Sequence, residues 1–84
     1  MNSVMTMDEV VSITNKFLVE EFEVELSSIQ PDAPVKETLE LDSLDYVDLV
    51  VLIDTHFGFK VQQQDFKGII TFQDFYNFLY NRVK

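Results

Sequence analysis

The sequence predicts an all-α fold, with three main helices and one short helix in a single domain that spans residues 1–84. Two observations lead to this prediction. Apolar residues recur at helical spacing in three separate stretches, and each stretch follows a residue that can cap a helix. Residues 22–26 alternate as a strand does, but no second good strand is available to pair with them. We therefore interpret them as an extended linker.

The first helix is predicted over about residues 7–22. Thr6 and Glu9 have the spacing of a capping box, in which a hydroxyl caps the helix and a glutamate follows three positions later. The apolar residues that then recur at helical spacing are Val10, Ile13, Phe17, Leu18 and Phe22.

A long loop is predicted between the first and second helices. Both prolines, Pro31 and Pro34, fall in this segment among other turn-forming residues. Apolar residues also occur here at Ile29, Val35 and Leu39. We therefore expect the loop to lie against the helices.

The second helix is predicted over residues 43–57. Asp42 supplies its N-cap, Asp45 is favourable in its first turn, and Gly58 can end it. A short helix is predicted over about residues 62–67, closed by Gly68.

The last helix is predicted over about residues 72–83. Thr71 can cap it, with Asp74 at the third position. Its apolar stripe is Phe72, Phe75, Tyr76, Leu79 and Val83.

The second helix has two apolar faces when it is drawn at about 100° per residue. The face expected to reach the core contains Tyr46, Leu49, Val50, Ile53 and Phe57. The second face contains Leu44, Val47 and Val51, flanked by Asp48 and Asp54. The long loop either covers this second face or leaves it exposed as a docking surface, where apolar contact gives burial and the acids give steering.

Charge and composition exclude several classes of function. The net charge is −9, and residues 37–59 contain six acids with no Lys or Arg. This argues against nucleic acid as a partner, favours a monomer, and would steer the protein toward basic partners. There is no cysteine, no apolar run long enough to span a membrane and no secretory signal, so we expect a cytoplasmic protein. No spacing of acids matches a calcium loop, and we expect no metal site.

Ser43 opens the second helix, where unpaired N–H groups and the helix dipole favour an anion. A phosphate attached to its hydroxyl would be stabilised there. A serine at this place can equally be a simple helix cap. His56, the one histidine, has no nucleophile placed beside it by any motif, and we interpret it as structural.

The triplet Asp42-Ser43-Leu44, which opens an acidic helix after a long loop, resembles the acyl carrier protein family. The resemblance extends from about Thr6 to Arg82 and includes the opening of the last helix at residues 69–72. It implies a four-helix acyl-carrier-like bundle. It also implies a carrier, not an enzyme, that holds acyl groups as thioesters for fatty-acid or polyketide-type synthesis. An aminoacyl or peptidyl carrier is the alternative within this class, and an unmodified acidic helical adaptor, with Ser43 as a cap, is the alternative outside it.

The resemblance also implies site residues and partners. Ser43, flanked by Asp42 and Leu44, would bear 4′-phosphopantetheine, donated by coenzyme A through a phosphopantetheinyl transferase. The positions that would dock the transferase and the acyl-transferring or condensing enzymes, through basic patches on these partners, are Leu44, Asp45, Val47, Asp48, Val51 and Asp54. One departure stands out, because Glu40 occupies a position where many carriers have glycine.

An acyl chain would need shelter from water. The residues among which interior space is expected are Phe17, Leu49, Ile53, Phe75 and Leu79. They can equally pack solid, in which case the interior holds no chain.

Overall fold

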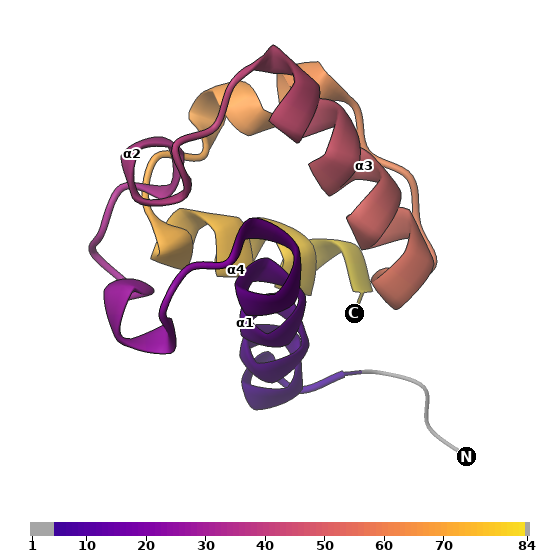
Figure 1. Ribbon diagram of the computed structural model, residues 1–84. Helices are drawn as coiled ribbons and strands as arrows, with labels where there is room; N and C mark the ends of the chain where they lie inside the picture. Colours follow the sequence, from indigo (N-terminus) through magenta and orange to yellow (C-terminus); the bar gives the residue numbers. More distant parts are fainter. Residues whose placement is uncertain (1–4, 84) are drawn as a thin grey trace.

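Helices from the two ends of the chain, α1 (Met7–Phe22) and α4 (Phe72–Val83), pack against each other and cross in the lower part of Figure 1. The computed structural model describes residues 5–83, and these residues contain helices and no strand. The remaining elements are η1 (Leu26–Ser28), α2 (Val35–Leu39), α3 (Ser43–Phe57) and η2 (Gln63–Gly68), where η denotes a 3₁₀ helix. The predicted all-α fold is confirmed.

The ends of the main helices follow from local chemistry. The capping box at α1 forms as predicted, with the Glu9 N–H donating to Thr6 Oγ1 at 3.2 Å and the Thr6 N–H donating to Glu9 Oε1 at 2.9 Å. Gly58 ends α3 in the left-handed region, at φ 81°. Glu23 ends α1 in the same region, at φ 57°, where glycine is usual.

The segment predicted as one long loop contains two elements that the sequence reading missed, η1 and α2. The prediction that this segment lies against the helices is confirmed, because Ile29, Val35 and Leu39 are buried. The apolar residues Val35 and Leu39 lie four positions apart, on one face of α2. That spacing is the signal that could have predicted the helix.

Backbone hydrogen bonds tie this segment to the beginning of α4. Val35 N–H donates to the Ile70 carbonyl at 2.9 Å, and Phe72 N–H donates to the Ala33 carbonyl at 3.1 Å. A third bond joins the Gln73 N–H to the Pro31 carbonyl at 2.9 Å. The segment between α1 and α3 is therefore held in place, and it fixes where α3 begins.

The core lies between α1, α3 and α4. Its almost fully buried side chains, each at most 1% exposed, are Val10, Phe17, Leu18, Leu49, Ile53, Phe72, Phe75 and Leu79. The short element η2 packs against α3, and Figure 1 shows the orange segment that contains η2 beside the beginning of α3. This arrangement places a second element next to Ser43.

Candidate functional site

The first turn of α3 is capped by two aspartates. Asp42 Oδ1 accepts hydrogen bonds from the N–H groups of Leu44 at 2.9 Å and Asp45 at 3.0 Å. In return, Asp45 Oδ2 accepts from the Asp42 N–H at 3.1 Å. The predicted N-cap role of Asp42 is confirmed, and this pair satisfies three backbone donors at the helix end.

Ser43 is the first residue of α3 and is exposed. The side-chain cap of this helix is Asp42, so the alternative in which Ser43 serves as the cap is wrong. The hydroxyl therefore stands at the positive end of the helix dipole, open to a large partner, and the helix does not need it as a cap. A serine oxygen in this position fits a phosphodiester.

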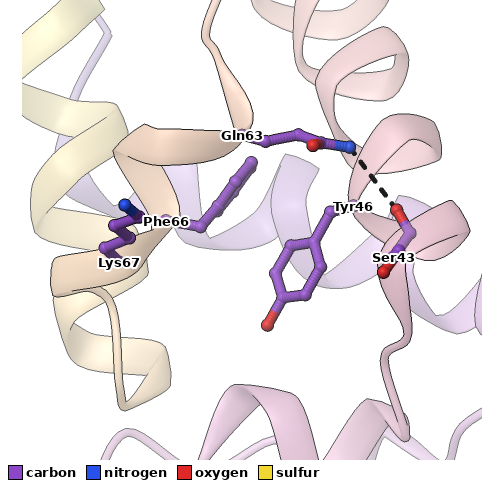
Figure 2. Close-up of a pocket in the computed structure, with 5 residues that line it drawn as sticks. All are labelled: Ser43, Tyr46, Gln63, Phe66 and Lys67. Carbon is purple, nitrogen blue, oxygen red and sulfur yellow. Dashed lines mark hydrogen bonds between the residues drawn. The ribbon is translucent and has the colours of Figure 1, made fainter.

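A pocket of about 250 Å³ lies beside Ser43, between the first turn of α3 and η2. Its lining residues are Ser43, Tyr46, Gln63, Phe66 and Lys67. Gln63 Nε2 donates to the Ser43 backbone carbonyl at 3.5 Å. Figure 2 shows the Gln63 amide reaching from η2 to Ser43, with the Tyr46 ring between the two elements.

Tyr46 connects this pocket to the interior. Its ring centroid lies 5.4 Å from that of Phe66, and Phe66 lies 6.1 Å from Phe75, which is fully buried. Burial raises the pKa of the Tyr46 phenol, and the nearby charge of Glu37 raises it further. The phenol is therefore a neutral hydroxyl at physiological pH, able to donate a hydrogen bond.

The second apolar face of α3 is exposed. Leu44, Val47 and Val51 are 74%, 46% and 58% exposed, so the alternative in which the loop covers this face is wrong. Asp48 is exposed beside these residues. Asp54, farther along the helix, forms an ion pair with Lys60 at 3.0 Å.

Glu40 lies three residues before Ser43 and adopts a left-handed backbone, at φ 53°. It ends α2, and its N–H donates to carbonyls in that helix. This conformation favours glycine, and it costs other residues roughly 1–2 kcal/mol. The position at which the family pattern has glycine is therefore one whose conformation suits glycine.

Several residues of the site were not predicted from the sequence. Gln63, Phe66 and Lys67 reach the pocket from η2, about twenty positions along the chain from Ser43, and no local pattern signals this approach. The residues proposed to enclose interior space are each at most 1% exposed, and the pocket beside Ser43 is lined by none of them.

His56 and the acidic side chains were the other candidates for chemistry in the sequence. The His56 ring stacks on Phe17, with centroids 5.0 Å apart, which agrees with a structural role. Within residues 5–83, no three His, Cys, Asp or Glu side chains form a group that could hold a metal ion. None of the helices described there is long and apolar enough to cross a membrane.

Comparisons with known proteins agree on one family. The family model described as "Phosphopantetheine attachment site" matches residues 13–79. The "Acyl carrier protein" of Thermosynechococcus vestitus (strain NIES-2133 / IAM M-273 / BP-1) is 27% identical over 79 residues, which cover 94% of this chain and 98% of the relative. The "Acyl carrier protein 2" of Ralstonia nicotianae (strain ATCC BAA-1114 / GMI1000) is 30% identical over 70 residues, which cover 83% and 86%.

Proposed function

Because this chain belongs to the acyl carrier protein family, whose cofactor is 4′-phosphopantetheine, we propose that it carries acyl intermediates of fatty-acid or polyketide-type synthesis on an arm attached to Ser43. When bound, the arm supplies a thiol that holds the acyl group as a thioester. The whole chain would act as one carrier domain and would leave catalysis to its partner enzymes.

The observation that most directly supports Ser43 as the attachment site is that a different residue, Asp42, caps the first turn of α3. Asp42 accepts the hydrogen bonds of the helix end, and the exposed Ser43 hydroxyl is not the side chain that caps the helix. In the attachment step, the Ser43 oxygen bonds to the phosphorus nearest the pantetheine of coenzyme A. The pyrophosphate P–O bond breaks, adenosine 3′,5′-bisphosphate leaves, and a base on the transferase takes the hydroxyl proton.

The exposed face of α3 beside Ser43 is the basis for a proposed docking site. Leu44, Val47 and Val51 offer apolar area on one side of α3, and Asp48 adds exposed negative charge. We propose that this surface, with Asp45 and Asp54 at its edges, binds the phosphopantetheinyl transferase and later the acyl-transferring or condensing enzymes. Positive patches on those enzymes would complement the acids and orient the encounter.

An aminoacyl or peptidyl carrier would use the same serine and the same surface. The two relatives described above are named acyl carrier proteins, which favours an acyl carrier. The adaptor alternative is a different class of function, because an adaptor would leave Ser43 without an arm.

Intact mass spectrometry tests the proposal. The purified chain is incubated with coenzyme A and a broad-specificity phosphopantetheinyl transferase. The wild-type chain should gain the mass of one arm. Ser43→Ala should gain nothing, whereas Ser28→Ala, a matched change at another exposed serine, should be modified fully. An unchanged wild-type mass, with a control carrier modified in the same reaction, would overturn the proposal.

A further inference from the structure

Arg82, in the last turn of α4, contacts side chains in three parts of the chain. Its guanidinium group lies over the rings of Phe78, in the same helix, and Phe59, which follows α3, and its Nη2 lies 3.6 Å from Asp65 Oδ2 in η2. We propose that Arg82 is a positioning residue, which holds η2 beside the attachment site and so keeps the chain ready to dock on the transferase. This inference rests on the proposed attachment at Ser43.

The element that Arg82 would hold, η2, is anchored to the core by one buried side chain among its six residues, that of Phe66. The hydrogen bond from Gln63 Nε2 to the Ser43 carbonyl is 3.5 Å long, beyond the roughly 2.7–3.2 Å usual for N–H···O bonds. A 3₁₀ helix also has poorer internal hydrogen-bond geometry than an α-helix. The position of η2 therefore depends on the contacts that its other side chains make.

Asp65 joins Arg82 to the beginning of η2. Its Oδ2 accepts the N–H of Gln62, the N-cap residue of η2, at 2.9 Å. The same oxygen lies 3.6 Å from Arg82 Nη2. The positive charge of Arg82 therefore stabilises the carboxylate that holds the first turn of η2, and the ion pair ties that turn to the end of α4.

Two aromatic rings keep the Arg82 guanidinium in place. Its Cζ lies 5.0 Å from the ring centroid of Phe78 and 5.9 Å from that of Phe59. Both distances are within the about 6 Å over which a cation and an aromatic face attract each other. Because the rings restrict the side chain, pairing with Asp65 costs less conformational entropy than it would for a free arginine.

The ion pair of Arg82 is better shielded from water than another pair nearby. The side chains of Arg82 and Asp65 are 43% and 26% exposed, whereas those of Lys60 and Asp54 are 86% and 41% exposed. Exposed ion pairs contribute little to stability because water and salt screen them. We therefore expect the pair at η2 to matter more than the pair at Lys60.

The position of η2 bears on attachment because η2 reaches the first turn of α3, where Gln63 donates to the Ser43 carbonyl. When η2 is in place for only part of the time, fewer chains are ready to dock at any moment. The apparent affinity of the transferase then falls in proportion to that fraction, which raises KM and leaves kcat unchanged. Arg82 would thus act on attachment through η2, without touching the reacting atoms.

Hydrogen exchange on the unmodified chain measures the hold of Arg82 on η2. The reporting amides are those of Asp65 and Ile69, which donate to backbone carbonyls near the two ends of η2. Arg82→Gln should speed their exchange about fivefold or more, because it removes both the ring contacts and the ion pair. Exchange at Leu49 and Ile53, in the buried face of α3, should stay at the wild-type rate.

Matched variants separate the ion pair from the ring contacts. Arg82→Lys keeps the charge and loses the planar group, so its exchange rates should lie between those of wild type and Arg82→Gln. Asp65→Asn keeps an oxygen that can accept the Gln62 N–H but removes the charge. In that background, Arg82→Gln should speed exchange less than it does in wild type. Lys60→Gln breaks the more exposed pair and should leave the exchange of η2 unchanged.

The second experiment measures attachment of the arm by the transferase. Arg82→Gln should raise the KM for the chain about threefold or more with kcat unchanged, and Arg82→Lys should recover part of this loss. Lys16→Gln removes a positive charge from an exposed position on α1 and should not raise KM. Both glutamine variants make the chain more negative, and attraction to a basic transferase would then lower KM. A rise in KM therefore reports the position of η2 and not the change in charge.

Three results would overturn the inference. The first is unchanged exchange at η2 in Arg82→Gln, and the second is equal acceleration in α1, α3 and η2, which would show a general loss of stability. The third is faster exchange confined to η2 with an unchanged KM, which would mean that attachment does not depend on where η2 lies. A wild-type chain that gains no arm would instead contradict attachment at Ser43, and the exchange rates of the unmodified chain distinguish that failure from the others.

Discussion

Asp42 and Asp45 hold the first turn of α3 by capping each other's backbone, with the Asp45 N–H 3.0 Å from Asp42 Oδ1 and the Asp42 N–H 3.1 Å from Asp45 Oδ2. Ser43 lies between these two residues in sequence, and its side chain is not the cap. The structure thus separates the residue that stabilises the helix end from the residue proposed to bear the arm. Stability and modification can therefore be measured as independent properties.

The first prediction concerns this separation. Asp42→Ala should lower the free energy of unfolding by about 1 kcal/mol, because it removes the cap of α3. Ser43→Ala should change it by no more than about 0.5 kcal/mol, because the substituted side chain is exposed and is not a cap. Urea unfolding followed by circular dichroism measures both values. Equal losses in the two variants would mean that Ser43 also stabilises the turn.

The second prediction concerns the left-handed backbone of Glu40. Glu40→Gly should raise the free energy of unfolding by about 0.5–1 kcal/mol, because relief of the unfavourable φ outweighs the entropy cost of glycine. Glu37→Gly is the matched control within α2 and should lower stability by about 1 kcal/mol. The two variants are compared by urea unfolding. A loss of stability in both would show that the Glu40 side chain has a stabilising role of its own.

The third prediction concerns the apolar and acidic surface on α3. Leu44→Ala and Asp48→Asn should each lower kcat/KM for modification by the transferase about fivefold or more, if these residues lie in the docked interface. The defect of Asp48→Asn should shrink at high salt, because ions screen the charge that this variant lacks. Glu20→Gln, which alters an acid on α1, should leave kcat/KM unchanged. A transferase rate that is indifferent to all three substitutions would place docking elsewhere.

The fourth prediction concerns Asp74, the acid in the first turn of α4. Hydrogen bonds from the Thr71 and Ile70 N–H groups hold the pKa of Asp74 below its ordinary value of 3.8. A carboxyl group whose pKa is lower in the folded state stabilises the fold above the unfolded-state pKa, and this contribution is lost as pH falls. The stability difference between wild type and Asp74→Asn should therefore be constant near neutral pH and should decrease below pH 3.8. Thermal unfolding across a pH series measures it.

Thr71→Ala is the control for that pH series. It removes the hydroxyl that accepts from the Asp74 N–H at 3.2 Å and that makes the smallest contribution to the lowered pKa of Asp74, but it leaves both amide donors to the carboxylate. Its effect on stability should depend less on pH than the effect of Asp74→Asn. The same pH dependence in both variants would contradict the assignment of the lowered pKa chiefly to the two amides.

The fifth prediction concerns Thr14, which is fully buried in α1 with no hydrogen-bond partner for its Oγ1 among the described residues. Thr14→Val has nearly the same shape and removes the unsatisfied hydroxyl, so it should raise the free energy of unfolding by about 1 kcal/mol. Thr14→Ser keeps the hydroxyl and loses a methyl group, so it should lower stability by about 1 kcal/mol. Urea unfolding compares the two. A loss of stability in Thr14→Val would mean that the hydroxyl does find a partner in solution.

The sequence was most informative where one short-range rule governs structure. The stretches at residues 7–22, 43–57 and 72–83 carry the periodicity and the caps of helices, and α1, α3 and α4 cover the same residues. The sequence was less informative between α1 and α3. There the prolines and turn residues obscured α2, whose position depends on hydrogen bonds to the start of α4.

The features of the site also fall into those that the sequence predicted and those that it did not. Asp42 as a cap and the exposed face of α3 could be predicted, because both follow from positions on a single helix. Whether the loop covered that face depended on tertiary packing, and the sequence left it open. The pocket beside Ser43 depends on Gln63 and Lys67, which approach from η2 only once the chain has folded.

The hydrogen bonds between Val35 and Ile70 and between Ala33 and Phe72 also bear on the position of the site. They clamp together the two ends of the segment that contains α3, η2 and Ser43. The segment that bears Ser43 is therefore a closed loop of chain whose two ends are bonded to each other at the start of α4. Its position relative to α1 and α4 is fixed at this junction as well as by the packing of Leu49 and Ile53 in the core.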